Sequence, residues 1–248
     1  MLQFILLILI GLLVGTFVIS TGGGGGSIYL GVLTTIFGLA PAAAAATSIV
    51  TALPALAIGS WLYYRQGQIN FHLGNTMLVS AIPAVIIGSL LAPYIPTKIY
   101  SLIIGLILIV LGLQILYKLI AKNKNKAPTQ SKLLPLVFGA LSGLMVGIAG
   151  LSGGGPIMAG LLMMGATMIN ASATSSYVLI CMSIVGALLH LTGGHIDWSA
   201  GIGLMIGATT GAALAPRLMK KFATGRGEII LKIVIGALLV LLGVKTLY

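Results

Sequence analysis

Long apolar segments, separated by short polar stretches, make up almost the whole chain. A helix needs about 20 apolar residues to cross a bilayer, and several segments approach that length. In the first half, membrane-spanning helices are predicted over residues 2–20, 42–64, 73–92 and 99–117. A lysine-rich stretch then interrupts the pattern, and a new apolar segment follows over residues 134–151. The pattern therefore predicts an all-α, polytopic membrane protein.

Two glycine-rich stretches interrupt the helical pattern at corresponding places in the two halves. Glycines fill positions 22–26, and Ser-Gly-Gly-Gly-Pro occupies positions 152–156. Glycine inside a helix costs about 0.5–1 kcal/mol relative to alanine, so each run should end the helix before it. Short apolar segments follow at 28–39 and 156–166. In lipid, such a break survives only where protein or a water-filled cavity satisfies the freed backbone groups.

The second half of the chain repeats the first. Five short blocks recur in the same order, which indicates that one unit has been duplicated. The chain is therefore divided into a first transmembrane repeat (1–117), a basic cytoplasmic linker (118–133) and a second transmembrane repeat (134–248). The matching blocks are 11–15 with 139–143, 46–48 with 173–175, 67–71 with 194–198, 88–93 with 211–216, and 105–117 with 236–248.

The relative direction of the two repeats depends on whether the short segments behind the glycines cross the membrane. If they do not, each repeat has four crossings and the repeats run parallel. If they do, each repeat has five crossings and the repeats are inverted. Arg65, the linker and the basic residues between 217 and 226 then share one side. Because positive residues concentrate in cytoplasmic loops, the inverted arrangement is favoured, with both termini outside and the linker in the cytoplasm.

Composition agrees with the membrane class and narrows the partners. Hydrophobic residues make up 58% of the chain and charged residues 6%, against about 25% charged in soluble domains. The formal net charge of +11 is what basic loops of a multi-pass protein produce, so nucleic acid is not an expected partner. Cys181 is the only cysteine, which excludes an intrachain disulfide. The two acids, Asp197 and Glu228, form no catalytic or metal-binding pattern, so neither enzymatic activity nor a cofactor is expected.

The glycine breaks are the first candidate substrate-binding elements. Transporters built from inverted repeats direct half-helix N-termini at anionic substrates near the membrane midplane. Free N–H groups and the positive end of the helix dipole favour an anion there. The alternative is that the glycines serve only close helix packing. The candidate residues are Gly24, Gly25, Gly26, Ser27, Gly153, Gly154 and Gly155.

Hydroxyl side chains form a second group of substrate-binding candidates. Thr47 and Ser48 in the first repeat correspond to Thr174 and Ser175 in the second, each pair near the start of a full span. A hydroxyl group can donate to an oxyanion without the desolvation penalty of a buried charge. The alternative is a bond back to a carbonyl of the same helix, which is the commoner use.

Ionisable residues within the spans are few, and each is a functional hypothesis. His190 is a candidate proton relay because histidine titrates near neutral pH; an interfacial histidine is the alternative. Asp197 precedes Trp198 in the hairpin and is expected to be a turn or cap residue. Arg65 is expected to be a snorkelling charge at the basic side of the membrane.

These residues together resemble the TauE/SafE family of sulfite exporter-type permeases. The resemblance is carried by segment 11–15 leading into the glycines at 22–26, by Ala46-Thr47-Ser48, by the hairpins at 67–71 and 194–198, and by segment 139–155. It covers essentially the whole chain. It implies transport of small sulfur-containing anions such as sulfite or sulfonates across an inner or plasma membrane, without a prosthetic group.

Two positions depart from the family pattern, and both bear on the substrate. Tyr29-Leu30-Gly31 stands where a proline usually follows the first glycine run, and Arg65 is the only arginine of a hairpin that usually carries more.

The sequence therefore favours a multi-pass secondary transporter of the plasma membrane, an exporter of sulfite or an organosulfonate. Its expected partners are a small anionic substrate and the lipid bilayer, and a second copy of the chain in a homodimer is a further candidate. Two alternatives stay open. A passive anion channel would give unsaturable conductance, and a scaffold subunit of a sulfur-metabolism complex would co-purify with another protein without binding an anion.

Overall fold

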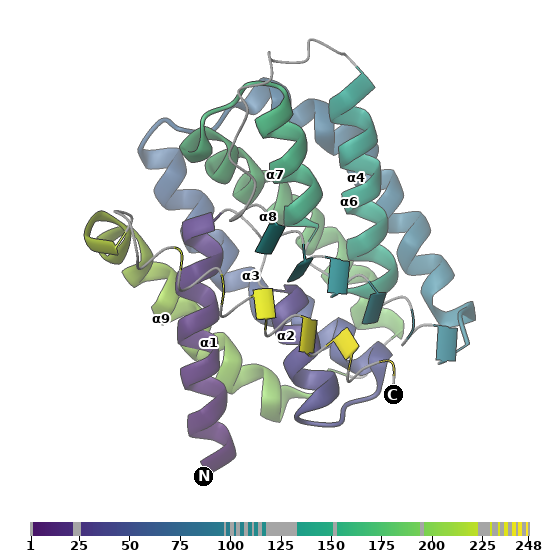
Figure 1. Cartoon of the computed structure of the whole chain (residues 1–248). Helices are drawn as coiled ribbons and strands as arrows, with labels where there is room; N and C mark the ends of the chain where they lie inside the picture. The colour runs from purple at the N-terminus through teal and green to yellow at the C-terminus, as the bar shows by residue number, and fades with distance from the viewer. Residues whose placement is uncertain are drawn as a thin grey trace.

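The chain is described by a computed structural model over residues 2–21, 26–96, 98–99, 133–150, 153–193 and 196–222, with separate residues between 102 and 117 and between 229 and 247. Throughout these residues the regular secondary structure is helical (Figure 1). Among the described residues, three helical segments are long and apolar enough to cross a membrane: Pro41–Arg65, Phe71–Leu91 and Ile169–Leu189. The predicted all-α, polytopic class is therefore confirmed.

Up to residue 96 and from residue 133, the helices follow the apolar segments predicted from the sequence, and each repeat begins with a long helix, a short helix and two long helices. Most of the predicted span 99–117 lies outside the described residues. Residues 118–132 of the predicted linker lie outside the described residues. In chain order the elements are α1 (Leu2–Thr21), α2 (Gly26–Thr35), α3 (Pro41–Arg65), α4 (Phe71–Leu91), the 3₁₀ turn η1 (Ala92–Tyr94), α6 (Leu133–Ala149), α7 (Gly154–Met163), α8 (Met168–Gly193) and α9 (Trp198–Phe222).

Proline, glycine and asparagine set the ends of α3 and α4. Pro41 lies in the first turn of α3, where its missing N–H costs no helical hydrogen bond. After Arg65, Gly67 adopts a φ of +65°, a left-handed conformation that suits glycine. Asn70 then caps α4, because its side chain accepts the N–H of Leu73 at 3.1 Å. The turn is short, so α4 begins beside the end of α3.

The two repeats pack against each other through pairs of helices, and the first pair is α1 of the first repeat with α9 of the second (Figure 1). A side chain at Gly207 would overlap the backbone of Ile8, and one at Gly211 would overlap the backbone of Leu12 and Thr16. The two backbones therefore touch directly, as small residues permit between membrane helices. Because both contacts advance in the same direction along each helix, α1 and α9 run parallel.

The second pair is α6 of the second repeat with α4 of the first. Gly139 faces the backbone of Met77, and Gly147 faces the backbone of Val85. This pair is also parallel and also depends on glycine. It is the counterpart of the α1–α9 pair, because α6 and α4 occupy the positions of α1 and α9 in the opposite repeats.

At the centre, α3 and α8 cross in opposite directions. Ile49, near the start of α3, lies against Gly186 in the second half of α8. Ser60 and Tyr64, near the end of α3, share a groove with Tyr177 near the start of α8. The equivalent central helices of the two repeats are therefore antiparallel.

The remaining contacts divide the long helices into two sets by direction. Thr47 and Thr51 of α3 meet Asp197 and Gly201 at the start of α9 in the same order, so α3 and α9 are parallel. On the other side, the start of α4 meets the start of α8 through Asn70 and Thr174. The first set is α1, α3 and α9, and the second is α4, α6 and α8.

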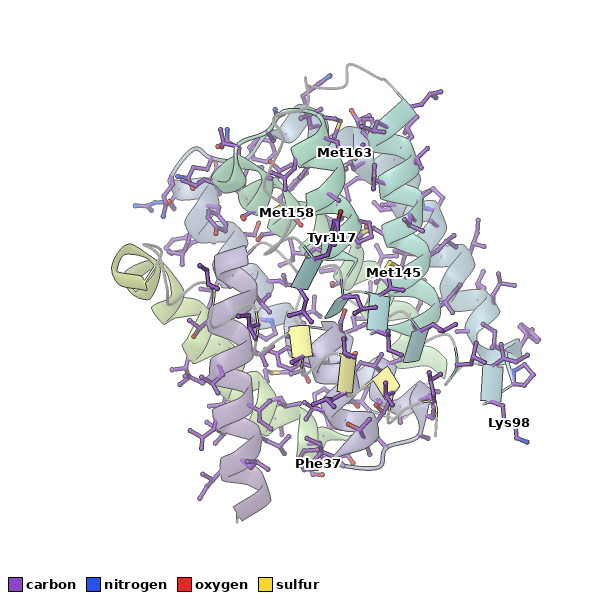
Figure 2. All side chains as sticks on the ribbon, viewed as in Figure 1. Phe37, Lys98, Tyr117, Met145, Met158 and Met163 are labelled. Carbon is purple, nitrogen blue, oxygen red and sulfur yellow. The ribbon has the colours of Figure 1, made fainter. Side chains whose placement is uncertain are left out.

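The short helices α2 and α7 also end at opposite sides of the molecule. Phe37, which follows α2, and Met163, the last residue of α7, lie at opposite ends of the molecule (Figure 2). Corresponding helices of the two repeats therefore point in opposite directions throughout the parts that these contacts cover.

The α1–α9 contact predicts a position-specific sensitivity to added volume. Gly207→Val should destabilise the protein by about 1–3 kcal/mol or more, because overpacking would force the two backbones apart. Ile206→Val changes the adjacent residue, whose side chain is 48% exposed, and should leave stability near wild type. Thermal unfolding of both variants in detergent tests this. Equal unfolding temperatures would contradict the direct backbone contact.

Candidate functional site

The second glycine break is a kinked, tightly packed segment between α6 and α7. α6 ends at Ala149, and Gly150 has a φ of +64°. A Cβ atom at Gly150 would also come within 2.6 Å of Ala45. The hydroxyl of Ser142 donates to the carbonyl of Gly153. Glycine is therefore required at position 150 both by conformation and by the approach of α3.

This break packs against the beginning of α3, which belongs to the other repeat. Residues 44–49 of α3 are all buried. The hydroxyl of Ser48 lies 3.0 Å from the carbonyl oxygen of Gly150 and 2.9 Å from that of Ala45, so one donor is shared between the break and its own helix. The predicted Ala-Thr-Ser element and the predicted glycine break thus meet across the repeats. Their role as substrate ligands stays a prediction.

The first glycine break is described only at its flanks, since Gly24 and Gly25 lie among residues 22–25, outside the described residues. α1 ends at Thr21 and α2 begins at Gly26. Near the end of α1, the carbonyl of Ile19 accepts the hydroxyl of Tyr63 at 2.7 Å. The flank before the first break therefore lies beside the last part of α3.

The two breaks consequently lie toward opposite ends of α3. The second break contacts Ser48, whereas the first follows a segment that contacts Gly59 and Tyr63. At 1.5 Å per helical residue, these positions are about 16–22 Å apart along α3. A single small anion is too short to contact both breaks at once in this conformation. The candidate residues therefore divide into two half-sites.

The threonines of the two Ala-Thr-Ser elements make matching hydrogen bonds. The Thr47 hydroxyl oxygen accepts the backbone N–H of Asp197 at 3.1 Å, and that of Thr174 accepts the backbone N–H of Asn70 at 2.9 Å. Both threonine side chains are fully buried. Each threonine thus anchors the start of a long helix in the opposite repeat. A hydroxyl that accepts one bond still carries a hydrogen to donate.

Asp197 is a helix cap, as the sequence predicts. Its carboxylate accepts the hydroxyl of Ser199 at 2.5 Å and the backbone N–H groups of Ser199 and Ala200 at 3.0 and 3.1 Å. The Ser199 hydroxyl and these backbone N–H groups hold the pKa of the Asp197 carboxyl below its ordinary value. The carboxylate therefore stays charged at neutral pH and stabilises the start of α9.

The remaining candidates differ in how fully they are described. Ser27, Ser175 and Gly154 are buried, and Gly155 is partly buried. His190 belongs to α8, but its side chain lies outside the described residues. The described residues hold no group of three metal-binding side chains.

A groove beside Arg65 is a feature that the sequence interpretation missed. It has a volume of about 330 Å³, lies between α3 and α8, and is lined by Trp61, Tyr64, Phe71 and Tyr177 among others. The Arg65 guanidinium lies 5.5 Å from the centre of the Trp61 ring. Trp61 and Tyr64 are more than half exposed. Exposed aromatic residues beside a basic residue are typical of a membrane–water interface.

The threonine contacts predict a symmetric pair of destabilising substitutions. Thr47→Val and Thr174→Val each keep the shape of the side chain but leave a backbone N–H without its acceptor, at a cost of about 1–3 kcal/mol. Thr47→Ser and Thr174→Ser keep the acceptor and should recover most of that loss. Unfolding temperatures of the four variants test this. Valine variants as stable as wild type would show that the two bonds do not hold the repeats together.

Comparison with known proteins identifies the family of the chain. The family model described as "Sulfite exporter TauE/SafE" matches residues 7–246. The probable membrane transporter protein YunE of Bacillus subtilis is 22% identical, over 99% of this chain and 98% of its own length. YdhB of B. subtilis is 24% identical over 92% and 93%, and YfcA of Escherichia coli is 23% identical over 94% and 85%; both are also named probable membrane transporter proteins. The chain is therefore a multi-pass membrane protein that belongs to the TauE/SafE family.

Proposed function

We propose that this protein is a secondary transporter that exports sulfite or an organosulfonate across the plasma membrane. The observation that carries the proposal is the contact between the Gly150 break and Ser48 of the opposite repeat. It brings the break between α6 and α7 together with a hydroxyl-bearing segment inside the protein. Membership of the family and the transporter names of its relatives support the same class of activity.

The chemistry of the half-sites suits an anion. The first N–H groups of α7, at Gly154 and Gly155, have no partner within their own helix, and the helix dipole adds partial positive charge. Pro156 follows at a position where its missing N–H costs little. The whole chain carries only two acidic residues. Among the described residues the one acid is Asp197, which meets Thr47 through its backbone N–H while its carboxylate is bound to the start of α9.

The half-sites are proposed to act alternately. Substrate would bind at the first half-site, formed by Gly24, Gly25, Gly26, Ser27, Thr174 and Ser175, and at the second, formed by Gly153, Gly154, Gly155, Thr47 and Ser48. The opposite directions of equivalent helices support inverted repeats, which exchange access by rocking one repeat against the other. A negative-inside membrane potential drives anion efflux without a coupling residue, since one charge gains about 2.3 kcal/mol per 100 mV.

Charge gives the orientation of this arrangement. α3 ends at Arg65, α6 begins beside the start of α4, and α9 ends at the same end of the molecule as α3. In the sequence, the lysines of the linker precede α6, and Arg217, Lys220 and Lys221 lie near the end of α9. By the positive-inside rule this end is cytoplasmic.

A topology experiment tests the orientation. In a Cys181→Ala background, single cysteines at Asn125→Cys and Tyr248→Cys should react with a membrane-impermeant thiol reagent from opposite sides of the membrane. Tyr248→Cys should react in intact cells, and Asn125→Cys only after permeabilisation. Labelling of both cysteines from the same side would contradict the inverted arrangement.

Transport itself is measured in proteoliposomes loaded with labelled sulfite. Wild-type protein should give saturable efflux that a membrane potential accelerates. Gly154→Val should reduce the rate at least tenfold, because a side chain at the N-terminus of α7 blocks approach to its N–H groups. Ser48→Ala should reduce it less.

Ile184→Val is the matched control, since this residue of α8 is 48% exposed and lies outside both half-sites. Protein from each variant is first checked for a single folded species. Undiminished efflux with Gly154→Val would remove the second break from the mechanism. An absence of sulfite efflux by wild type would reject sulfite as the substrate.

A further inference from the structure

Aromatic rings from three helices line the groove between α3 and α8. The ring centre of Tyr64, in the last turn of α3, lies 6.2 Å from that of Phe71, the first residue of α4. The ring centre of Phe71 lies 5.1 Å from that of Tyr177 in α8, and both pairs meet edge to face. The hydroxyl of Tyr177 already donates to the side chain of Asn75 at 2.8 Å. The three rings therefore support one another as an apolar wall.

The groove extends from the end of α3 into the membrane-spanning part of that helix. Its lining residues on α3 run from Ala57 to Tyr64, which is about 10 Å along the helix axis. The volume of about 330 Å³ is at the lower end of the range of about 300–1,000 Å³ that is typical of ligand pockets. Trp61, Tyr64 and Phe71 are exposed, so the groove is open to the outside. A hydrocarbon chain suits such a surface.

A positive charge lies at the edge of this groove. The guanidinium of Arg65 is 5.5 Å from the centre of the Trp61 ring, one helical turn earlier, and the side chain of Arg65 is exposed. Asp197 is the one acid among the described residues, and it contacts Thr47, about 27 Å from Arg65 along α3. Within the described part of the chain, no carboxylate therefore neutralises Arg65.

The second repeat has neither the cation nor its aromatic neighbour at the equivalent positions. In the register of the two Ala-Thr-Ser elements, Leu188 corresponds to Trp61 and Thr192 to Arg65. Leu188 is 61% exposed and Trp61 is 56% exposed, so both positions lie on the surface of their repeat. The shared fold therefore does not require the Trp61–Arg65 pair.

We propose that this groove binds an anionic phospholipid, with the phosphate on Arg65 and one acyl chain along the aromatic wall. Arginine pairs with phosphate through parallel N–H bonds, and the apolar wall beside it matches a chain attached to that phosphate. A free phosphate ion would leave the wall without a partner. The site is separate from the proposed half-sites and does not depend on which anion is transported.

The charge of the groove argues against a second copy of the chain as its occupant. In a two-fold symmetric dimer the same patch lies on both sides of the interface. Two copies joined through this groove would bring two Arg65 side chains together without a described carboxylate between them. A lipid seated here would contact α3 and α4 of the first repeat and α8 of the second.

The test uses the fluorescence of Trp61, one of the two tryptophans of the chain. Trp198→Phe leaves Trp61 as the only tryptophan. This full-length variant is placed in phosphatidylcholine vesicles that contain increasing fractions of brominated phosphatidylglycerol or, for comparison, brominated phosphatidylcholine. Bromine quenches an indole ring that it contacts. Phosphatidylglycerol should quench Trp61 at an about fivefold lower fraction than phosphatidylcholine, because one basic residue favours an anionic lipid by about this factor.

Two charge variants show whether the preference belongs to the groove. Arg65→Gln should reduce the fivefold preference to about one. Lys98→Gln is the matched control: Lys98 is also exposed, but it follows the far end of α4, about 30 Å from the start of that helix beside Arg65 (Figure 2). This variant should keep the fivefold preference. Each protein is first checked for a single folded species.

Trp198 supplies a control within the same molecule. It is 52% exposed and corresponds to Phe71 in the second repeat, where the position equivalent to Arg65 is a threonine. Trp61→Phe leaves Trp198 as the only tryptophan, which should be quenched equally by the two lipids. An equal preference for phosphatidylglycerol at both tryptophans would overturn the proposal, because the preference would then come from the net charge of the chain.

Three further results would also overturn it. The first is a preference at Trp61 that is absent, or that Arg65→Gln leaves unchanged. The second is displacement of brominated phosphatidylglycerol by an equal concentration of glycerol 3-phosphate, which would show that the acyl chain does not contribute. The third is protection of Trp61 from both lipids while Trp198 is quenched, which would show that a second copy of the chain covers the groove.

Discussion

The structure depends on one constraint, the absence of water from the interior of a bilayer. Every backbone N–H and carbonyl group there needs a partner within the protein. Continuous helices meet this need by themselves, but a helix break does not. The break after Ala149 is tolerated because Ser142 binds the carbonyl of Gly153 and Ser48 reaches that of Gly150. The Ala-Thr-Ser element is thus as necessary to the break as the glycines are.

The same constraint explains why neither repeat is complete alone. α1 finds its closest partner in α9, and α4 finds its closest partner in α6. The starts of α4 and α9 are held by threonines that belong to the other repeat. The hydrogen-bond acceptors and packing partners that one repeat needs are therefore supplied by the other repeat. This arrangement links the conformation of the break after Ala149 to the position of the opposite repeat.

The sequence predicted the helices and their breaks well, because hydropathy and glycine act locally. The cap at Asp197 and the correspondence of the hairpins also follow from neighbouring residues. The pairing of helices across repeats was not predicted. Lipid and protein interior are both apolar, so a membrane helix carries little periodic signal of which face is buried. The glycines at 207 and 211 hold that information, but glycine spacing alone does not identify a partner helix.

The candidate hydroxyl groups show the same limit at the level of the site. Thr47 and Thr174 were predicted as donors to an anion, and the structure shows their oxygens as acceptors for Asp197 and Asn70. The repeat alignment contained this pairing, because it matches Thr47 with Thr174 and Asn70 with Asp197. The alignment does not show which threonine contacts which helix start; the structure does, because each threonine contacts the opposite repeat. The aromatic groove beside Arg65 was missed for a similar reason, since Trp61 and Tyr177 are far apart in the sequence.

The packing of helices from different repeats also limits the ways in which a chain of this kind can arise. Two separate copies of one repeat reproduce these contacts only if they insert in the membrane in opposite orientations. A repeat with a strong bias of basic residues would insert in one orientation only. Joining two copies through a segment that does not cross the membrane removes this requirement, because each copy then inherits its orientation from the other. In such a joined chain the two repeats are free to carry different residues at equivalent places, as Asn70 and Asp197 do.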